Sequence, residues 1–508
     1  MNAIQLSVIT FALAALTAFA GGVGDGTVRT QAAILPEPQK IAWGEGVFDA
    51  GTGKVSRATV TRFERDASVP KEGYRLTVTP QAVTVVSSDD AGAYYAVKTL
   101  GQLARRENGR TVVPAVAVTD APAYPWRAMF LDVSRHFFGK ETVKRLLDVM
   151  AEYKYNVFHW HLVDDQGWRL EIKRYPKLVE YGAVRPESPS RGNYLKPNGE
   201  KYGPFYYTQD DVREILAYAK ERHITVMPEI ELPGHSRAAL AAYPELSCVG
   251  AALQPRTPWT VWGISEEVYC AGNDAAIKFL EDVLDEVCGL FDSPVVHIGG
   301  DECPRVRWQA CPKCQARVKA EGLKDASGLQ AWMTSHFTAF LAKRGRRTIG
   351  WDEILDGDIP TDAIVMSWNG AKGGIAAAKK GHDVVMTPLE SCYFIFNQGL
   401  EDDPVEYSRS WYFEPLPTSR VYAFDPVKGI PESARKHVLG AEGCLWSEYI
   451  WTDSELMWSA FPRALALSEV LWTGAKHRSW EEFSSAAEVH RRKLISRNIN
   501  CAPLGGKD

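Results

Sequence analysis

The sequence predicts a (β/α)8 barrel preceded by a small α/β domain, and three observations carry this prediction. From Pro125 onward, short apolar runs alternate with amphipathic helical patterns, as parallel strands alternate with their covering helices. Eight such runs occur within roughly 350 residues, a length that suits a barrel with some long loops. The runs end in carboxylate and indole side chains, and barrels of this class build their sites from the carboxyl ends of their strands.

Residues 23–122 are expected to form the small α/β domain. The segments "YRLTVT" and "AVTVVS" are rich in β-branched residues and are joined by Pro80-Gln81, which predicts two neighbouring strands. The next segment, "AGAYYAVKTLGQLARR", places its apolar residues on one side of a helix. A further strand, "TVVPAVAVTDAP", then leads into a proline-rich linker.

The barrel is expected to span residues 123–475. Its strands are "AMFLDVSR", "NVFHWHLVDD", "ITVMPEIE", "PVVHIGGDE", "RTIGWDE", "AIVMSWN", "DVVMTP" and "VLGAEGCLW". Residues 141–153 and 328–345 show apolar residues at helical spacing between the first two strands and between the fourth and fifth. Residues 476–508 are expected to form a C-terminal helical tail that caps the barrel.

Composition restricts the class of protein. The chain has 508 residues, of which 45% are apolar and 24% charged, as in soluble globular proteins. The net charge of −5 and the lack of a basic cluster argue against nucleic-acid binding. Residues 1–20 hold an apolar run that ends in Ala18-Phe19-Ala20, typical of a bacterial signal peptide and too short for a membrane span. We therefore expect an exported protein, periplasmic or secreted, without a transmembrane anchor in the mature chain; nothing in the sequence bears on oligomeric state.

The nine cysteines all lie beyond residue 247. In an exported chain, a disulfide between Cys248 and Cys270 would close the loop between them. Cys303, Cys311 and Cys314 form a denser cluster, but a zinc site needs a fourth ligand that the adjacent sequence does not offer. The local pattern thus favours a disulfide or free thiols over a metal.

Carboxylates and indoles dominate the ends of the predicted strands. Carboxylates accept hydrogen bonds from hydroxyl groups, and indole faces stack on the C–H faces of sugar rings. These residues predict a carbohydrate site: Asp132, Arg135, Asp164, Asp165, Glu229, Glu231, His235, Asp301, Glu302, Trp351, Asp352, Trp368, Trp446 and Glu448.

The pair Asp301-Glu302 follows two glycines at the end of the fourth strand. Like charges held close together raise one pKa, which suits a general acid. His235 follows a Pro-Gly turn on the same face, where it could tune proton transfer at Glu302. His159 and His161 point to the same side of their strand. A packed, hydrogen-bonded histidine pair is the preferred interpretation, and a metal site is the alternative.

Seven motifs occur in the order found in glycoside hydrolase family 20, the β-N-acetylhexosaminidases, and the chain resembles this family from about Trp126 to Trp472. The motifs are "LDVSRHFF", "HWHLVDDQGWR", "EIELPGHS", "HIGGDE", "GWDEI", "MSWNG" and "EGCLWSEY". The preceding domain also resembles the one that commonly precedes the barrel in this family. The resemblance implies an exo-acting, retaining enzyme that removes terminal β-linked GlcNAc or GalNAc from glycans and needs no metal or organic cofactor.

The resemblance also implies roles for individual residues. The substrate's own 2-acetamido oxygen would act as the nucleophile, a known exception to the use of two enzyme carboxylates. Glu302 would be the general acid and then the base, and Asp301 would orient the acetamido group. The remaining roles are Arg135 on ring hydroxyls, Asp164 and His235 in support of Glu302, Trp351, Trp368 and Trp446 as pocket walls, Tyr393 on the acetamido oxygen and Glu448 on a distal hydroxyl.

One position departs from the family pattern. Where members often have Tyr-x-Asp, this chain has Tyr393-Phe394-Ile395, and Ile395 cannot bind a hydroxyl. Asn397 is a possible substitute, so the choice between GlcNAc and GalNAc stays open. Two other functions also stay open on the residues alone: a metal-dependent barrel hydrolase such as a deacetylase, and a sugar-binding barrel without catalysis.

Overall fold

The computed structural model describes residues 33–400, 414–474 and 478–505, so the expected signal peptide lies outside the described residues. Contacts divide the chain into two compact units. The first runs to Tyr124 and includes Glu152–Lys154 and Ser468–Ser496; the second holds the remainder. No helix in the described ranges is both long and apolar enough to cross a membrane.

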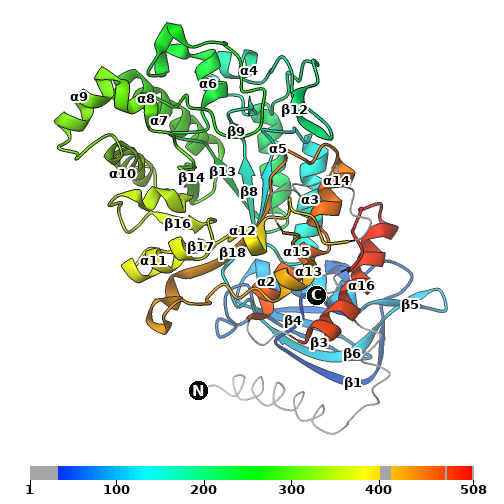
Figure 1. The fold of residues 1–508 in the computed structure, drawn as a ribbon. Coiled ribbons are helices and arrows are strands. Elements are labelled where there is room, and N and C mark those ends of the chain that lie inside the picture. The colour runs from blue at the N-terminus through cyan, green and yellow to red at the C-terminus, as the bar shows by residue number, and fades with distance from the viewer. Residues whose placement is uncertain (1–32, 401–413, 475–477, 506–508) are drawn as a thin grey trace. The chain divides into compact units, whose positions relative to one another are not determined.

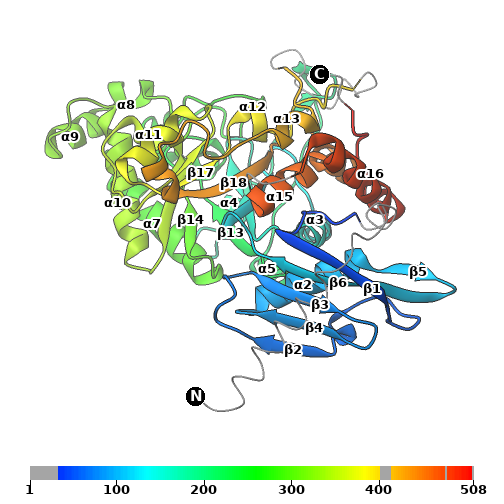
Figure 2. The same ribbon diagram turned by 90° about the horizontal axis from the view of Figure 1, so that it is seen from below.

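The first unit is built on a six-stranded sheet with the strand order β1-β6-β3-β4-β2, and β5 pairs with β6 (Figure 2). The strands are β1 (Lys40–Asp49), β2 (Arg62–Arg65), β3 (Tyr74–Val78), β4 (Val83–Ser87), β5 (Arg105–Glu107) and β6 (Arg110–Asp120). The strands β3, β4 and β6 and the helix α2 (Asp90–Leu103) confirm the sequence prediction. The sequence prediction missed β1, whose side chains are mostly exposed and whose pairing shifts register between Trp43 and Val47.

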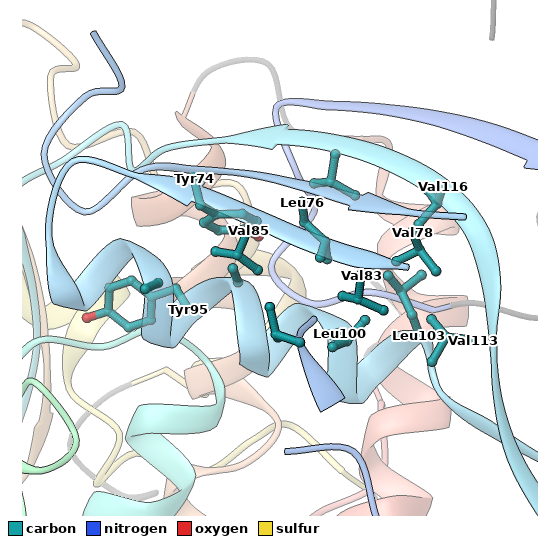
Figure 3. Close-up of a cluster of buried hydrophobic side chains, with 14 of the residues drawn as sticks. Tyr74, Leu76, Val78, Val83, Val85, Tyr95, Leu100, Leu103, Val113 and Val116 are labelled. Atoms are coloured by element: carbon teal, nitrogen blue, oxygen red, sulfur yellow. The ribbon is translucent and has the colours of Figure 1, made fainter. Parts of the chain in front are cut away.

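One face of this sheet packs on α2 (Figure 3). Burial alternates along β3 and β4, so Leu76, Val78, Val83 and Val85 share the covered face. Leu100 of α2 lies in the same cluster. Complete burial of such a side chain stabilises the fold by about 1.5–3 kcal/mol, which gives this unit a core of its own.

The helix α16 (Trp480–Ser496) belongs to the first unit by its contacts, whereas the linear division had placed it in a tail that caps the barrel. Its His490 is buried, and the Nε2 atom lies 2.9 Å from the carbonyl oxygen of Ala33. The Tyr153 hydroxyl lies 3.1 Å from the Nδ1 atom of the same ring. These contacts join segments that are distant in the sequence, which a division by residue number does not anticipate.

The second unit is the predicted barrel, closed by parallel strands in the order β7-β8-β13-β14-β15-β16-β17-β18 (Figure 1). All eight predicted strands are present: β7 (Trp126–Asp132), β8 (Val157–His161), β13 (Thr225–Glu229), β14 (Val295–His297), β15 (Arg347–Trp351), β16 (Ile364–Ser367), β17 (Val384–Met386) and β18 (Val438–Leu445). The main helices between them are α3 (Lys140–Glu152), α5 (Gln209–Lys220), α7 (Asp274–Leu290), α10 (Gly328–Ala342) and α11 (Lys372–Lys380). Each strand therefore delivers the residues at its carboxyl end to one face of the barrel.

Candidate active site

A cavity of about 330 Å³ opens at the carboxyl ends of the barrel strands. Eight of the ten residues predicted for the site line it: Arg135, His235, Asp301, Glu302, Trp368, Tyr393, Trp446 and Glu448. Gly263, Ile264, Leu389, Ile395 and Phe396 complete the lining. The other two predicted residues, Asp164 and Trp351, are buried and are not among the lining residues.

The turn after β14 gives Asp301 and Glu302 their separate directions. Gly299 and Gly300 have φ values of 66° and 97°, and a Cβ atom on Gly299 would lie 1.8 Å from the carboxylate of Glu231. Glu302 itself has a φ of 44°, a conformation that costs a residue with a Cβ atom about 1–2 kcal/mol. The backbone N–H of Glu302 donates to Oε2 of Glu353 at 2.9 Å, and this bond helps to hold the strained turn.

The two carboxylates differ in burial and in protonation. The side chain of Asp301 is 10% exposed and that of Glu302 is 37% exposed. Burial, opposed by His235 and assisted by the charge of Glu302, raises the pKa of Asp301 to about 8. Burial also acts on Glu302, but the hydrogen bond and charge of His235 outweigh it and lower the pKa of this carboxyl. The raised pKa thus belongs to Asp301 and not to Glu302, the residue expected to be the acid.

His235 lies between the two carboxylates and a second acidic pair. Its Nε2 atom is 3.5 Å from Oδ2 of Asp301 and 3.6 Å from Oε2 of Glu302. Its Nδ1 atom is 3.2 Å from a carboxylate oxygen of both Asp164 and Asp165. Burial opposes ionisation, yet the charges of Asp164 and Asp301 raise the pKa of His235 well above its usual range. The ring of His235 is therefore an imidazolium, and its positive charge stabilises the ionised form of Glu302.

Arg135 forms one side of the cavity. Its guanidinium lies 2.9 Å from Oδ2 of Asp164, and its Nε–H donates to Gln166 at 2.8 Å. The Cζ atom is 5.0 Å from the ring centroid of Trp446, within the range of a cation–π contact. Because the guanidinium is fixed on three sides, its remaining donors have a defined direction toward a ligand.

Aromatic rings form the walls. The rings of Trp368 and Tyr393 are stacked, with centroids 6.2 Å apart and planes 22° apart. The ring of Tyr393 lies 6.2 Å from that of Trp446. Trp351 lies behind Trp446, with centroids 5.9 Å apart, and its Nε1–H donates to Glu229 at 2.9 Å. The expected three-tryptophan wall therefore consists here of Trp368, Tyr393 and Trp446, with Trp351 in support.

A sealed layer of histidines and glutamates lies in the barrel interior. His159 contacts Glu442 at 2.8 Å and Glu229 at 3.2 Å, and His297 contacts Glu229 at 2.7 Å. His161 contacts Glu229 and lies 2.8 Å from Asp164. Burial opposes the shift, but these carboxylates raise the pKa of His159 to about 9 and that of His161 to about 10. The packed, hydrogen-bonded histidine pair is confirmed.

Several groups in the barrel contain residue types that bind metals. The distances between their atoms distinguish the interior group from the group at the cavity. In the interior, imidazole and carboxylate atoms are 2.7–2.8 Å apart, a direct hydrogen bond that leaves no room for an ion between them. At the cavity, one nitrogen of His235 and oxygens of Asp301 and Glu302 lie within 4.8 Å of one another. Here Nε2 of His235 faces Asp301 and Glu302, while Nδ1 contacts Asp164 and Asp165, so the ring lies between two acidic pairs.

A model of the catalytic domain of glycosyl hydrolase family 20 matches residues 124–475, and a model of domain 2 of that family matches residues 33–121. The chain belongs to glycosyl hydrolase family 20. It is 44% identical over 446 residues to a beta-hexosaminidase of Porphyromonas gingivalis, an alignment that covers 86% of this chain but 55% of that protein. It is 33% identical over 479 residues to a beta-hexosaminidase of Akkermansia muciniphila, covering 92% of this chain and 91% of that one. The chain thus spans about half of the first relative and nearly all of the second.

A solved family 20 structure has the same fold. This structure, an exo beta-N-acetylglucosaminidase of Vibrio harveyi in complex with N-acetylglucosamine, superposes with a TM-score of 0.83 at 30% identity. The alignment covers 94% of this chain and 79% of that one.

The structure adds residues that sequence reasoning missed. Glu353 holds the backbone of Glu302 and Gln166 holds Arg135, whereas Asp165, which contacts His235, was among the predicted strand-end carboxylates. Each is adjacent to a residue already singled out in a family 20 motif, but a motif does not tell which neighbour turns inward. Burial raises the pKa of Glu353 to about 7, so this carboxyl titrates beside the turn that carries Asp301 and Glu302.

Position 395, where the sequence departs from the family pattern, lies in the lining of the cavity. Ile395 is 3% exposed and lines the cavity, where family 20 members often have aspartate. Asn397 is not among the lining residues, and its carbonyl oxygen accepts from the N–H of Leu416. Within the described chain, Asn397 therefore does not replace the missing carboxylate, and this side of the cavity is apolar.

Proposed function

We propose that this protein is an exo-acting, retaining β-N-acetylhexosaminidase that removes terminal β-linked GlcNAc or GalNAc by substrate-assisted catalysis. The single observation that carries this proposal is the divided pair at the end of β14. Asp301 is buried, and its Oδ1 atom has no hydrogen-bond partner among the described residues. Glu302, its neighbour, is exposed to the same cavity. The pair offers an acceptor for an amide N–H and, next to it, a proton donor.

Two carboxylates on adjacent residues of one turn do not oppose each other across a glycosidic bond, as a conventional retaining pair must. In the proposed reaction, the acetamido oxygen of the substrate forms a bond to the anomeric carbon while the glycosidic C–O bond breaks. The proton of Glu302 passes to the leaving oxygen. Glu302 then accepts a proton from water, which opens the bicyclic oxazolinium intermediate with net retention of configuration.

This reaction requires a protonated Glu302 and an ionised Asp301, the reverse of the order in the unliganded site. We infer that substrate binding moves the proton. A sugar that covers Glu302 removes water from a side chain that is 37% exposed, and desolvation raises the pKa of a carboxyl. An acetamido N–H that donates to Oδ1 of Asp301 stabilises the ionised form and lowers its pKa. His235, 3.5 and 3.6 Å from the two carboxyls, links them.

The walls supply binding. The stacked rings of Trp368 and Tyr393, together with Trp446, form an aromatic enclosure suited to the methyl group and the ring faces of one N-acetyl sugar. Arg135 and Glu448 line the cavity and are assigned to ring hydroxyls. A cavity of about 330 Å³ is at the small end of ligand sites and favours a single terminal residue over an internal segment of a chain.

The substrates assigned to this protein are glycans with a terminal N-acetylhexosamine, and we assign it to the periplasm or the extracellular medium on its N-terminal segment. The named relatives are bacterial beta-hexosaminidases. The solved neighbour that carries N-acetylglucosamine is consistent with the same sugar here.

The decisive experiment compares chromogenic β-glycosides of GlcNAc, GalNAc and glucose. The proposal expects kcat/KM to be higher by at least about 10³-fold for the two N-acetyl sugars, since only they carry an internal nucleophile worth several kcal/mol of the barrier. A thiazoline analogue of the bicyclic intermediate should inhibit competitively. Equal rates on the GlcNAc glycoside and the glucoside would refute the mechanism. The ratio of GlcNAc to GalNAc rates reports what the apolar side chain of Ile395 does to sugar choice.

A further inference from the structure

Four cysteine side chains meet on the barrel unit away from the cavity. The sulfur atoms of Cys248, Cys270, Cys311 and Cys314 all lie within 4.8 Å of one another. Three of the separations are short: Cys248 to Cys314 at 3.7 Å, Cys270 to Cys311 at 3.7 Å and Cys270 to Cys314 at 3.6 Å. All four thiols are free, so the disulfide expected between Cys248 and Cys270 is not formed.

These separations match a tetrahedron of thiolates around one metal ion. With Zn–S bonds of about 2.3 Å, the edge of a regular tetrahedron of sulfurs is about 3.8 Å. Two sulfurs in a disulfide are about 2.05 Å apart, and unbonded thiols have no reason to gather four at a time. The sulfur of Cys270 lies close to both Cys311 and Cys314, an arrangement that a set of paired disulfides does not produce.

The backbone around the cluster is shaped for close approach. A Cβ atom on Gly272 would lie 2.1 Å from the carbonyl carbon of Lys313 and 2.3 Å from the amide nitrogen of Cys314, so only glycine fits there. The lack of a side chain at Gly272 therefore lets the segment that carries Cys270 approach the backbone of Lys313 and Cys314 closely.

Each pair of cysteines is fixed by its own local structure. Cys311 caps the helix α9 (Pro312–Ala320), so Cys311 and Cys314 flank its first turn, where the positive end of the helix dipole favours thiolates. An isolated antiparallel bridge between Ser247 and Tyr269 joins the two segments that carry Cys248 and Cys270, and the N–H of Cys270 donates to the carbonyl of Leu246 at 2.9 Å. The two further ligands that the Cys-x-x-Cys motif lacks thus come from the segment after β13, and Cys303 is not part of the group.

We propose that these four cysteines bind one Zn²⁺ ion as a structural tetrathiolate site. Its function would be to tie together the segments that follow β13 and β14, two neighbouring strands whose ends lead to His235 and Glu302. The N–H of Tyr269 donates to the carbonyl of Pro233 at 3.1 Å, two residues before His235. The indole N–H of Trp308, in the segment that follows Glu302, donates to the carbonyl of Tyr269 at 2.9 Å.

The site has no part in the proposed hydrolysis, because its ligands are four protein thiolates and leave no open position. Zinc would instead stabilise the loops that carry His235 and Glu302. Binding to the folded chain alone adds its free energy to the stability of the fold, so loss of the metal lowers the melting temperature.

The test measures metal in the full-length protein purified without chelators in the presence of reductant. We expect one zinc per chain in the wild type by elemental mass spectrometry. Cys311→Ser should lose the zinc and melt at least about 5 °C lower. Cys288→Ser is the matched control, since Cys288 is a free cysteine outside the cluster, and this variant should keep both the zinc and the melting temperature. Because a variant can fail to fold, the wild type is also exchanged with Co²⁺, which should show the visible bands of a tetrahedral thiolate site.

The measurement is independent of the proposed glycosidase activity. A metal-free wild type whose four thiols are all alkylated in the native state would overturn the proposal. So would two disulfides, seen in protein prepared without reductant as four of these cysteines that are alkylated only after reduction, or iron in place of zinc. An inactive protein that still holds one zinc would refute the proposed function and leave the zinc site intact.

Discussion

Two groups of histidines and carboxylates lie at the carboxyl end of the same barrel, and they differ in their exposure to solvent and ligands. The interior layer of His159, His161, Glu229 and His297 is completely buried, and every ring contacts a carboxylate. At the cavity, Glu302 has a 37% exposed side chain, and an oxygen of Asp301 has no partner among the described residues. Residue type is the same in both places.

The difference shows which property identifies a reactive group. In the interior, complete burial keeps a ligand out; against the effect of burial, the carboxylates raise the pKa of His159 to about 9 and that of His161 to about 10, whereas burial and the charges of these two rings lower the pKa of His297 to about 4. At the cavity, the adjacent carboxyls hold different pKa values, and a ligand that excludes water changes the balance. The interior layer is thus assigned to stability and the cavity pair to catalysis, and each assignment can be tested by substitution.

The largest effect is expected for Glu302→Gln, which keeps the shape of the side chain and removes its proton. On a glycoside with a poor leaving group, kcat/KM should fall by about 10⁴-fold, about 5.5 kcal/mol, since general acid catalysis is lost. On a nitrophenyl glycoside, whose leaving group needs little protonation, the loss should be far smaller. Equal losses on both substrates would remove Glu302 from the role of acid.

The comparison variant in the interior is Glu229→Gln. It removes the carboxylate shared by three histidines and leaves buried charge without compensation, so we expect the protein to lose about 3–5 kcal/mol of stability. The measurement is urea unfolding followed by tryptophan fluorescence, with the exposed Asp210→Asn as control. A variant as stable as the wild type would show that the interior layer is not the structural element assigned here.

The sequence was sufficient for the barrel and for most of the site, because both depend on local patterns. Each strand is a short apolar run, and the carboxyl ends of all barrel strands lie at one face. The order of the strands in the sequence was therefore enough to place Arg135, His235 and Glu302 near one another. The irregular strand β1 has no such pattern and was missed. The distribution of the proton between Asp301 and Glu302 depends on how deeply each is buried, which no motif encodes.

The cysteines illustrate the same limit. Cys311 and Cys314 form a recognisable motif, but Cys248 and Cys270 precede it by more than 40 residues and contact it only in the folded chain. Local sequence contains no signal for that pairing. Contacts between side chains that are distant in the sequence are therefore what local sequence patterns could not predict here.

The smallest effect, counted per pH unit, is in the pH dependence of stability, and the two groups act over different pH ranges. The folded-state pKa of Asp301 is raised to about 8 from an ordinary value of 3.8. The folded state therefore binds the extra proton, and this group makes stability fall as pH rises from about 4 to 8, by at most about 1.4 kcal/mol per pH unit. His159 and His161 have folded-state pKa values of about 9 and about 10. Their contribution is complete below pH 6.5 and is lost as pH rises through 9 to 10.

Asp301→Asn should therefore flatten the decline in melting temperature between pH 4 and 8 and leave the decline above pH 8 unchanged. The physical reason is that the amide has no proton to lose, whereas the interior histidines keep their carboxylate partners. Melting temperatures of the wild type, Asp301→Asn and Asp210→Asn from pH 4 to 10 make the comparison, with Asp210 as a carboxyl that is 93% exposed. A slope below pH 8 that is identical in all three proteins would mean that Asp301 is already ionised in the free site. The proton would then have no reason to start on Asp301, and the proposed transfer to Glu302 on substrate binding would fail with it.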